Sequence, residues 1–185
     1  MKKYLYLSFV VLLTFCCTNQ VLVAQSATHE VGLRLTDLED IGFIYKKQKA
    51  ENRFTRFRVG SVNVNVQEDI FSLGLAAAIG FEKRKNIANK LSFIHGWEPS
   101  LFVSTTSVND DVISSVTPGI GYVLGFQYDF SDNFYLSLES IPSLSASFQF
   151  GDNVPDNNYR INAGFNANAI ALTAAYRFTT TKSDQ

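Results

Sequence analysis

The side chains that could support acid–base or metal chemistry are few and far apart. His29 and His95 are the two histidines, and their separation gives no spacing typical of metal ligands. No Gly-x-Ser-x-Gly nucleophile elbow is present. Gly119, Gly121 and Gly125 form a G-x-G-x-x-x-G pattern on one face of an extended segment, which differs from a nucleotide-binding loop. The sequence therefore predicts no catalytic residue, no metal site and no cofactor.

Isolated charges fall on a face that is otherwise rich in Gly, Ser, Ala and Asn. Lys46 and Arg160 share this face, and we expect six other charges on it to form a network in the interior: Glu30, Arg34, Glu82, Glu98, Glu139 and Arg177. An enclosed charge that is left unpaired costs several kcal/mol. The pattern favours structural pairing, while the alternative is that Glu98 or Glu139 lines a solute path opposite Arg34 or Arg177.

The elements that must position these charges are eight segments in which apolar and small or polar residues alternate. They span about 29–36, 41–48, 53–66, 71–84, 91–104, 115–128, 134–150 and 159–178. The apolar face shifts by one residue at Gly60-Ser61 and again near 167–169, which predicts a β-bulge in each segment. An even number of neighbouring strands predicts an all-β fold, an eight-stranded antiparallel up-and-down transmembrane β-barrel.

The charge of the connections alternates along the chain, except that the sixth, residues 129–133, is acidic. The odd-numbered connections are acidic and include Asp110, Asp111, Asp152 and Asp156, whereas the second and fourth, with their flanks, are basic: Lys46, Lys47, Lys49, Arg53, Lys83, Arg84, Lys85 and Lys90. This predicts periplasmic termini, with residues 104–114 and 151–158 as the two long outer loops. The four aspartates could hold divalent cations against lipopolysaccharide phosphates, although solubilisation of the loops is the simpler interpretation.

Two barrel classes fit eight such strands, and they differ in which face contacts solvent. A soluble barrel of the lipocalin type would keep apolar residues inside. Its Gly-x-Trp early in the first strand is absent, since Trp97 is the only tryptophan and lies in the fifth segment. Aromatic residues gather near strand ends, as in interfacial girdles: Tyr45, Phe54, Phe57, Phe81, Trp97, Tyr128, Phe130, Phe134, Tyr135, Phe148, Phe150, Tyr176 and Phe178. We therefore expect lipid outside and polar side chains inside.

The N-terminus has the layout of a secretory signal peptide. Lys2 and Lys3 precede an apolar run of about a dozen residues, shorter than the roughly 20 that a membrane helix needs. Val23-Ala24-Gln25 offers a cleavage point, which predicts a signal peptide over 1–25. The remaining 26–185 form one barrel domain, with strands over about 29–178 and a short tail, 179–185.

Processing as a lipoprotein at Cys16 or Cys17 is the alternative, and Phe15 disfavours it because a small residue is normally required there. Cleavage after residue 25 removes both cysteines, so no disulfide or thiolate remains. It changes the net charge from −1 to −3, because 14 basic residues then face 17 acidic ones. Nothing in that balance suggests a nucleic-acid partner.

Residues 170–178 close the pattern with an apolar strand face that ends in Tyr176 and Phe178, on either side of Arg177. Together with the signal peptide, the eight segments and the aromatic strand ends, this resembles the small outer-membrane barrels typified by OmpA's membrane domain and OmpX, over nearly all of 29–178. The resemblance implies a location in the cell outer membrane and Tyr176 and Phe178 as an assembly signal. It also implies outer-membrane lipid, lipopolysaccharide, the barrel-insertion machinery and periplasmic chaperones as partners. The tail after Phe178 is too short for a peptidoglycan-binding domain.

The expected function is that of a monomeric, non-enzymatic barrel with a structural, adhesion or surface-interaction role and a lumen closed by side chains. An eight-stranded barrel has an interior just wide enough for side chains to fill. A narrow pore or transporter for small solutes is the first alternative. A lipid-modifying outer-membrane enzyme is the second.

Overall fold

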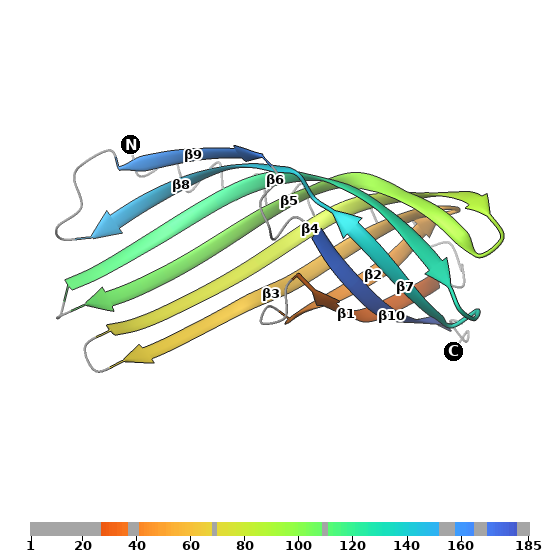
Figure 1. Ribbon diagram of the computed structural model, residues 1–185, viewed down its shortest axis with the longest axis horizontal. Helices are drawn as coiled ribbons and strands as arrows, with labels where there is room; N and C mark the ends of the chain where they lie inside the picture. The colour runs from red at the N-terminus through yellow and green to blue at the C-terminus, as the bar shows by residue number, and fades with distance from the viewer. Residues whose placement is uncertain are drawn as a thin grey trace, which may run out of the picture. The chain divides into compact units, whose positions relative to one another are not determined.

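The computed structural model describes residues 27–36, 41–67, 70–108, 111–151, 158–164 and 170–180, which form ten β-strands (Figure 1). The strands are β1 (Ala27–Leu35), β2 (Ile41–Ala50), β3 (Arg53–Gln67), β4 (Ile70–Ala88), β5 (Leu91–Val108), β6 (Asp111–Asp129), β7 (Phe134–Ser140), β8 (Ser143–Gly151), β9 (Tyr159–Gly164) and β10 (Ile170–Thr180). None of these residues belongs to a helix long and apolar enough to cross a membrane. The predicted signal peptide lies outside the described residues.

Eight of the strands close into a ring. Antiparallel pairing runs from β1 through β2, β3, β4, β5, β6 and β7 to β10, and β10 pairs back with β1. At this closing seam Ala27 pairs with Thr180 and Leu35 with Leu172. The prediction of an all-β, eight-stranded antiparallel barrel is confirmed.

The seventh and eighth predicted strands are each divided in two, so their prediction as continuous strands was wrong. β7 and β8 separate at Ile141-Pro142, where proline lacks the N–H that a continuous ladder would need. β6 pairs with β7 over Leu124–Asp129 and with β8 over 113–121. β9 and β10 are separated by residues 165–169, so the predicted bulge near 167–169 lies outside the described residues. The predicted bulge at Gly60 is confirmed by a register shift between Gly60 and Asn63.

One group of strands extends past the ring. β3, β4, β5, β6, β8 and β9 continue beyond β1, β2, β7 and β10, toward the left in Figure 1. The expected outer loop over 104–114 is wrong, because β5 and β6 stay paired as far as Val108 and Asp111. Hydroxyl pairs bridge the two strands at Ser104–Ser115, 2.8 Å, and at Thr105–Ser114, 3.1 Å. Serine and threonine lie on both faces of this hairpin, and the apolar Val112 and Ile113 are adjacent in sequence, so it lacks the alternation that reveals a strand.

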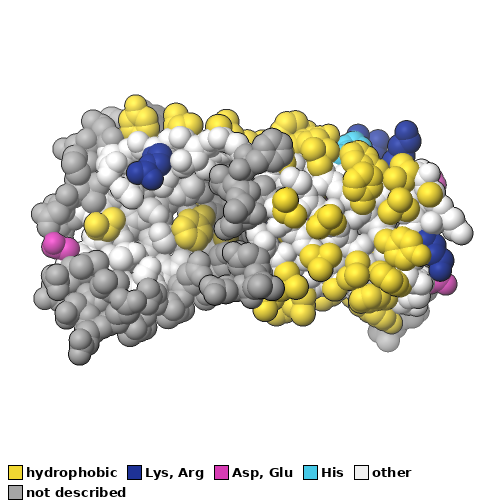
Figure 2. All heavy atoms as spheres, in the orientation of Figure 1, with side chains coloured by type: hydrophobic (Ala, Val, Ile, Leu, Met, Phe, Trp, Pro, Cys, Tyr) yellow, Lys and Arg dark blue, Asp and Glu magenta, His cyan; other side chains and the backbone are white. Residues whose placement is uncertain are grey.

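The barrel is apolar outside and charged inside. On β4, Leu75, Ile79 and Phe81 are 49%, 43% and 62% exposed, whereas Ala78 and Glu82, on the other face of the strand, are buried. Figure 2 shows hydrophobic side chains spread over the outer surface. β1, β2 and β10 have 9, 10 and 11 residues, which matches the length of tilted strand that crosses a bilayer core. This is the pattern of a membrane-spanning barrel and the reverse of a soluble one.

Two aromatic residues expected in the outer girdles lie in the interior instead. Phe54 and Tyr135 are 7% and 0% exposed. Phe134 and Leu136 flank Tyr135 on β7, and because side chains alternate along a strand, an outward Phe134 places Tyr135 inward. Their assignment to the girdles was wrong because it relied on nearness to a strand end and ignored this alternation.

Candidate functional site

The candidate site is a network of ion pairs in the interior of the ring. Inward positions of neighbouring strands lie side by side: Glu30 of β1 is opposite Lys46 of β2, and Lys46 is opposite Arg56 of β3. Side chains from directly opposed positions share a face of the sheet, so these three converge inside the closed barrel. All three are at most 1% exposed.

Arg56 lies at the centre of this network. Its Nη2 is 2.7 Å from Oε2 of Glu139, its Nη1 is 3.1 Å from Oε2 of Glu82, and its Nε is 2.8 Å from Oε2 of Glu98. The three carboxylates come from β7, β4 and β5. A Cβ added at Gly80 would lie 2.7 Å from Cγ of Arg56, so this glycine makes room for the arginine. One guanidinium thereby joins strands on opposite sides of the ring.

Further cations complete the central cluster. Lys46 Nζ lies 2.8 Å from Oε2 of Glu82 and 3.6 Å from Oε1 of Glu139. Arg34 Nη1 donates to Oε2 of Glu139 at 2.6 Å. Arg58 Nη2 donates to Oε1 of Glu98 at 2.9 Å. Each buried carboxylate therefore faces two or three cations, as enclosed charges require.

A second cluster surrounds Glu30. Arg84 donates to both carboxylate oxygens of Glu30, at 2.8 and 2.6 Å, in a bidentate pair. Arg177 Nε and the Tyr135 hydroxyl also donate to Glu30, at 2.9 and 2.8 Å. Arg84 Nε reaches Oε1 of Glu82 at 2.6 Å, which connects this cluster to the central one.

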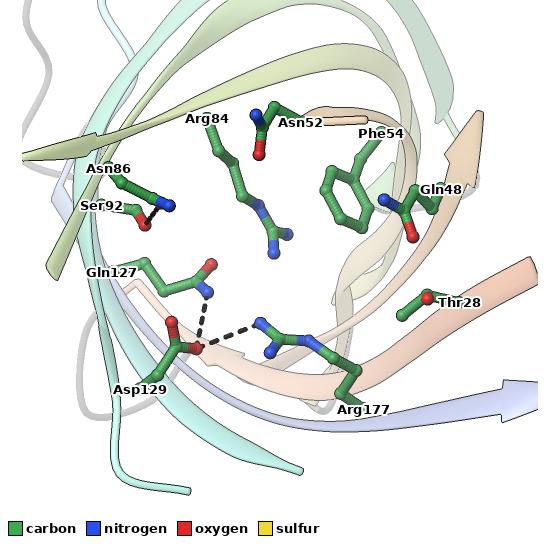
Figure 3. A pocket seen from close by; sticks show the side chains of 10 residues that line it. All are labelled: Thr28, Gln48, Asn52, Phe54, Arg84, Asn86, Ser92, Gln127, Asp129 and Arg177. Atoms are coloured by element: carbon green, nitrogen blue, oxygen red, sulfur yellow. Dashed lines mark hydrogen bonds and ion pairs between the residues drawn. The ribbon is translucent and has the colours of Figure 1, made fainter. Parts of the chain in front are cut away.

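A polar cavity of about 340 Å³ lies beside the second cluster, at the end of the barrel that holds Ala27 of β1 and Thr180 of β10 (Figure 3). Arg84 and Arg177 extend into it from opposite walls. Asp129 accepts hydrogen bonds from Arg177 at 3.1 Å and from Gln127 at 2.9 Å. The remaining lining groups are amides, hydroxyls and one ring: Thr28, Gln48, Asn52, Phe54, Asn86 and Ser92. Arg84, Arg177 and Asp129 belong both to the lining of this cavity and to the ion-pair network.

The network is nearly balanced in charge. Its cations are Arg34, Lys46, Arg56, Arg58, Arg84 and Arg177, and its carboxylates are Glu30, Glu82, Glu98, Glu139 and Asp129. Among the described residues, no cluster of His, Cys, Asp and Glu is placed to hold a metal ion. The arrangement can therefore cross-link strands of the ring through their interior side chains.

The structure brings the six sequence-predicted charges into this network. Four members, Arg56, Arg58, Arg84 and Asp129, were missed, and Lys46 was placed on the correct face without a role. The sequence did contain a signal for two of them: Arg56 and Arg58 alternate with the outward Phe57 and Val59, which places both arginines on the inner face of β3. Arg160 lies elsewhere, on β9, where it lines a cavity of about 300 Å³ with residues of β8.

The other predicted site residues lie away from the lumen. Tyr176 and Phe178 are on the outer face of β10, and Phe178 stacks on His29 with ring centroids 5.5 Å apart. His95 also faces outward, with Nδ1 3.2 Å from the Tyr122 hydroxyl. Asp111 is the exposed first residue of β6. Asp110, Asp152 and Asp156 lie outside the described residues.

Comparison with known proteins adds a likeness of fold. No protein-family model matches the chain, and no curated protein sequence is similar to it. A crystal structure of Neisserial surface protein A (NspA) is 10% identical with a TM-score of 0.42, over 82% of this chain and 93% of that chain. That of Ail, the attachment invasion locus protein of Yersinia pestis, is 13% identical with a TM-score of 0.45, over 83% and 97%. The assignment as a membrane barrel rests on the strand pairing and burial described above.

Proposed function

We propose that the protein is an integral outer-membrane barrel with a closed lumen and a structural, adhesion or surface-interaction role. The observation that carries the closed lumen is the ion-pair network, whose side chains come from β1, β2, β3, β4, β5, β6, β7 and β10. Opening a path for a solute would require several of these buried pairs to separate at once. Separating one buried pair leaves an uncompensated charge and costs about 3–5 kcal/mol.

A role at the cell surface is supported by the strands that extend beyond the ring. They project at the end opposite Ala27 and Thr180, and their hydroxyl groups pair from strand to strand. These pairs are Ser72–Thr106, Ser104–Ser115 and Thr117–Ser147. A polar sheet of this kind suits contact with water and polar partners outside the lipid. The predicted signal peptide and the aromatic end of β10 support the outer-membrane location.

Single-channel recording of the refolded barrel in a planar bilayer tests the closed lumen. We expect no stable openings from protein whose heat-modifiable migration on gels shows that it is folded. The narrow-pore alternative predicts discrete openings that change when Glu98→Gln or Glu139→Gln alters the network. Such openings would contradict the proposal.

A further inference from the structure

Six basic side chains lie outside the lumen at the end that holds Ala27 and Thr180; Lys90 lies in the turn between β4 and β5, and the other five lie on strands. We call these five the basic belt: Lys47 and Lys49 of β2, Arg53 of β3, and Lys83 and Lys85 of β4. Lys83 is exposed between the buried Glu82 and Arg84, so it points away from the lumen. The same alternation turns Lys47 outward next to the buried Lys46 and Arg53 outward next to Phe54.

The turn between Lys49 and Arg53 carries an exposed carboxylate, Glu51, but no described ion pair joins it to the basic belt. In the ranges that the structure describes, none of the belt's five side chains has an ion-pair or hydrogen-bond partner. Arg53 and Lys83 are directly opposite each other on neighbouring strands. Like charges in this relation are destabilising. The belt therefore contributes nothing favourable to the fold by itself, and an external anion would stabilise it.

The belt borders the surface that contacts lipid. Outward aromatic residues lie next to it on the same strands: Tyr45 on β2, Phe57 on β3 and Phe81 on β4. Tyr45 and Phe57 have ring centroids 6.0 Å apart. Aromatic rings of this kind occupy the headgroup level of a bilayer. Figure 2 shows Lys and Arg side chains gathered at this end, just past the hydrophobic surface.

We infer that the basic belt binds the phosphates of anionic phospholipid headgroups in the leaflet nearest Ala27 and Thr180. This inference rests on the proposed function as a membrane barrel. Lysine and arginine beside a membrane are attracted to anionic lipid, and the attraction grows with their number. The phospholipid leaflet is the source of phosphate, because the belt is continuous with the aromatic residues at this end. The extended strands lie at the opposite end.

Trp97 provides the readout. It is the chain's only tryptophan, it is 55% exposed, and it pairs with Phe81, two residues from Lys83. The full chain is reconstituted in phosphatidylcholine bilayers that contain brominated phosphatidylglycerol or brominated phosphatidylcholine, and quenching of Trp97 fluorescence gives the relative binding of each lipid. We expect phosphatidylglycerol to bind several-fold more strongly, and added salt to weaken that preference.

Matched variants separate charge from structure. Lys83→Gln with Lys85→Gln should remove most of the preference, whereas Lys83→Arg with Lys85→Arg should keep it. Equal quenching by both lipids in the unaltered protein, or a full preference in the glutamine variant, would overturn the inference. Absence of quenching by either lipid would mean that the barrel is not inserted, which would contradict the proposed function as well.

Discussion

Replacement of Arg56 by methionine should lower the free energy of unfolding of the barrel by about 3–5 kcal/mol. Arg56 is fully buried and contacts Glu82, Glu98 and Glu139. Methionine fills similar space but leaves three enclosed carboxylates with fewer cations, and an uncompensated buried charge is costly. Urea unfolding of the refolded protein in lipid vesicles, followed by Trp97 fluorescence, measures the change.

Arg58 is the matched control for Arg56, since it lies two residues along the same strand. Its side chain is 21% exposed and its ion pair is with Glu98. Arg58→Met should cost about 1 kcal/mol or less, because solvent screens a partly exposed pair. Glu139→Gln added to Arg56→Met should recover part of the loss, since it removes one of the unpaired charges. Equal losses for the two single variants would contradict a central role for Arg56.

Alanine at both Tyr176 and Phe178 should reduce the amount of folded barrel in the outer membrane by several-fold or more. The family resemblance implies that these residues form an assembly signal. Both side chains are on the outer face of β10, at 56% and 38% exposure, where assembly factors can reach them before insertion. Fractionation of cells, followed by quantification of the heat-modifiable band in outer membranes, measures the effect.

Ile170 and Leu172 provide the control for the assembly prediction. They lie on the same face of the same strand and are 59% and 43% exposed, so alanine there removes comparable apolar surface. We expect that pair of substitutions to leave assembly largely intact. Normal assembly of the Tyr176→Ala, Phe178→Ala variant, or an equal loss in the control, would show that the aromatic end carries no special signal.

A strand can be predicted from the sequence when its two faces differ in polarity. β4 was readily predicted because apolar Leu75 and Phe81 alternate with small or buried residues. The ends of β5 and β6 were mistaken for a loop because serine and threonine occupy both faces. The division between β7 and β8 was signalled by Pro142, yet the apolar pattern continues past it and conceals the change of partner along β6.

The lumen charges were predicted only in part, for a related reason. Glu98 and Glu139 were recognised because they interrupt apolar strands, whereas Arg56 and Arg84 fall among many basic residues near turns and looked like solvated flanks. Which of two neighbouring cations is buried depends on strand phase: Lys83 points outward and Arg84 inward. Pairings such as Arg84 with Glu30, 54 residues apart, depend on how the ring closes, which no local pattern encodes.

The central claim is that apolar side chains face lipid while the opposite face of each strand lines a charged interior. Three consecutive alanines of β4, Ala76, Ala77 and Ala78, test it because they alternate between the two faces of one strand. Each is replaced in turn by a spin-labelled cysteine in protein whose Cys16 and Cys17 are serine, and collisions with membrane-dissolved oxygen are measured in bilayers. The structure predicts high oxygen accessibility at Ala77 and low accessibility at Ala76 and Ala78. High accessibility at Ala76 and Ala78 with low accessibility at Ala77, or no alternation among the three, would contradict a lipid-facing apolar surface.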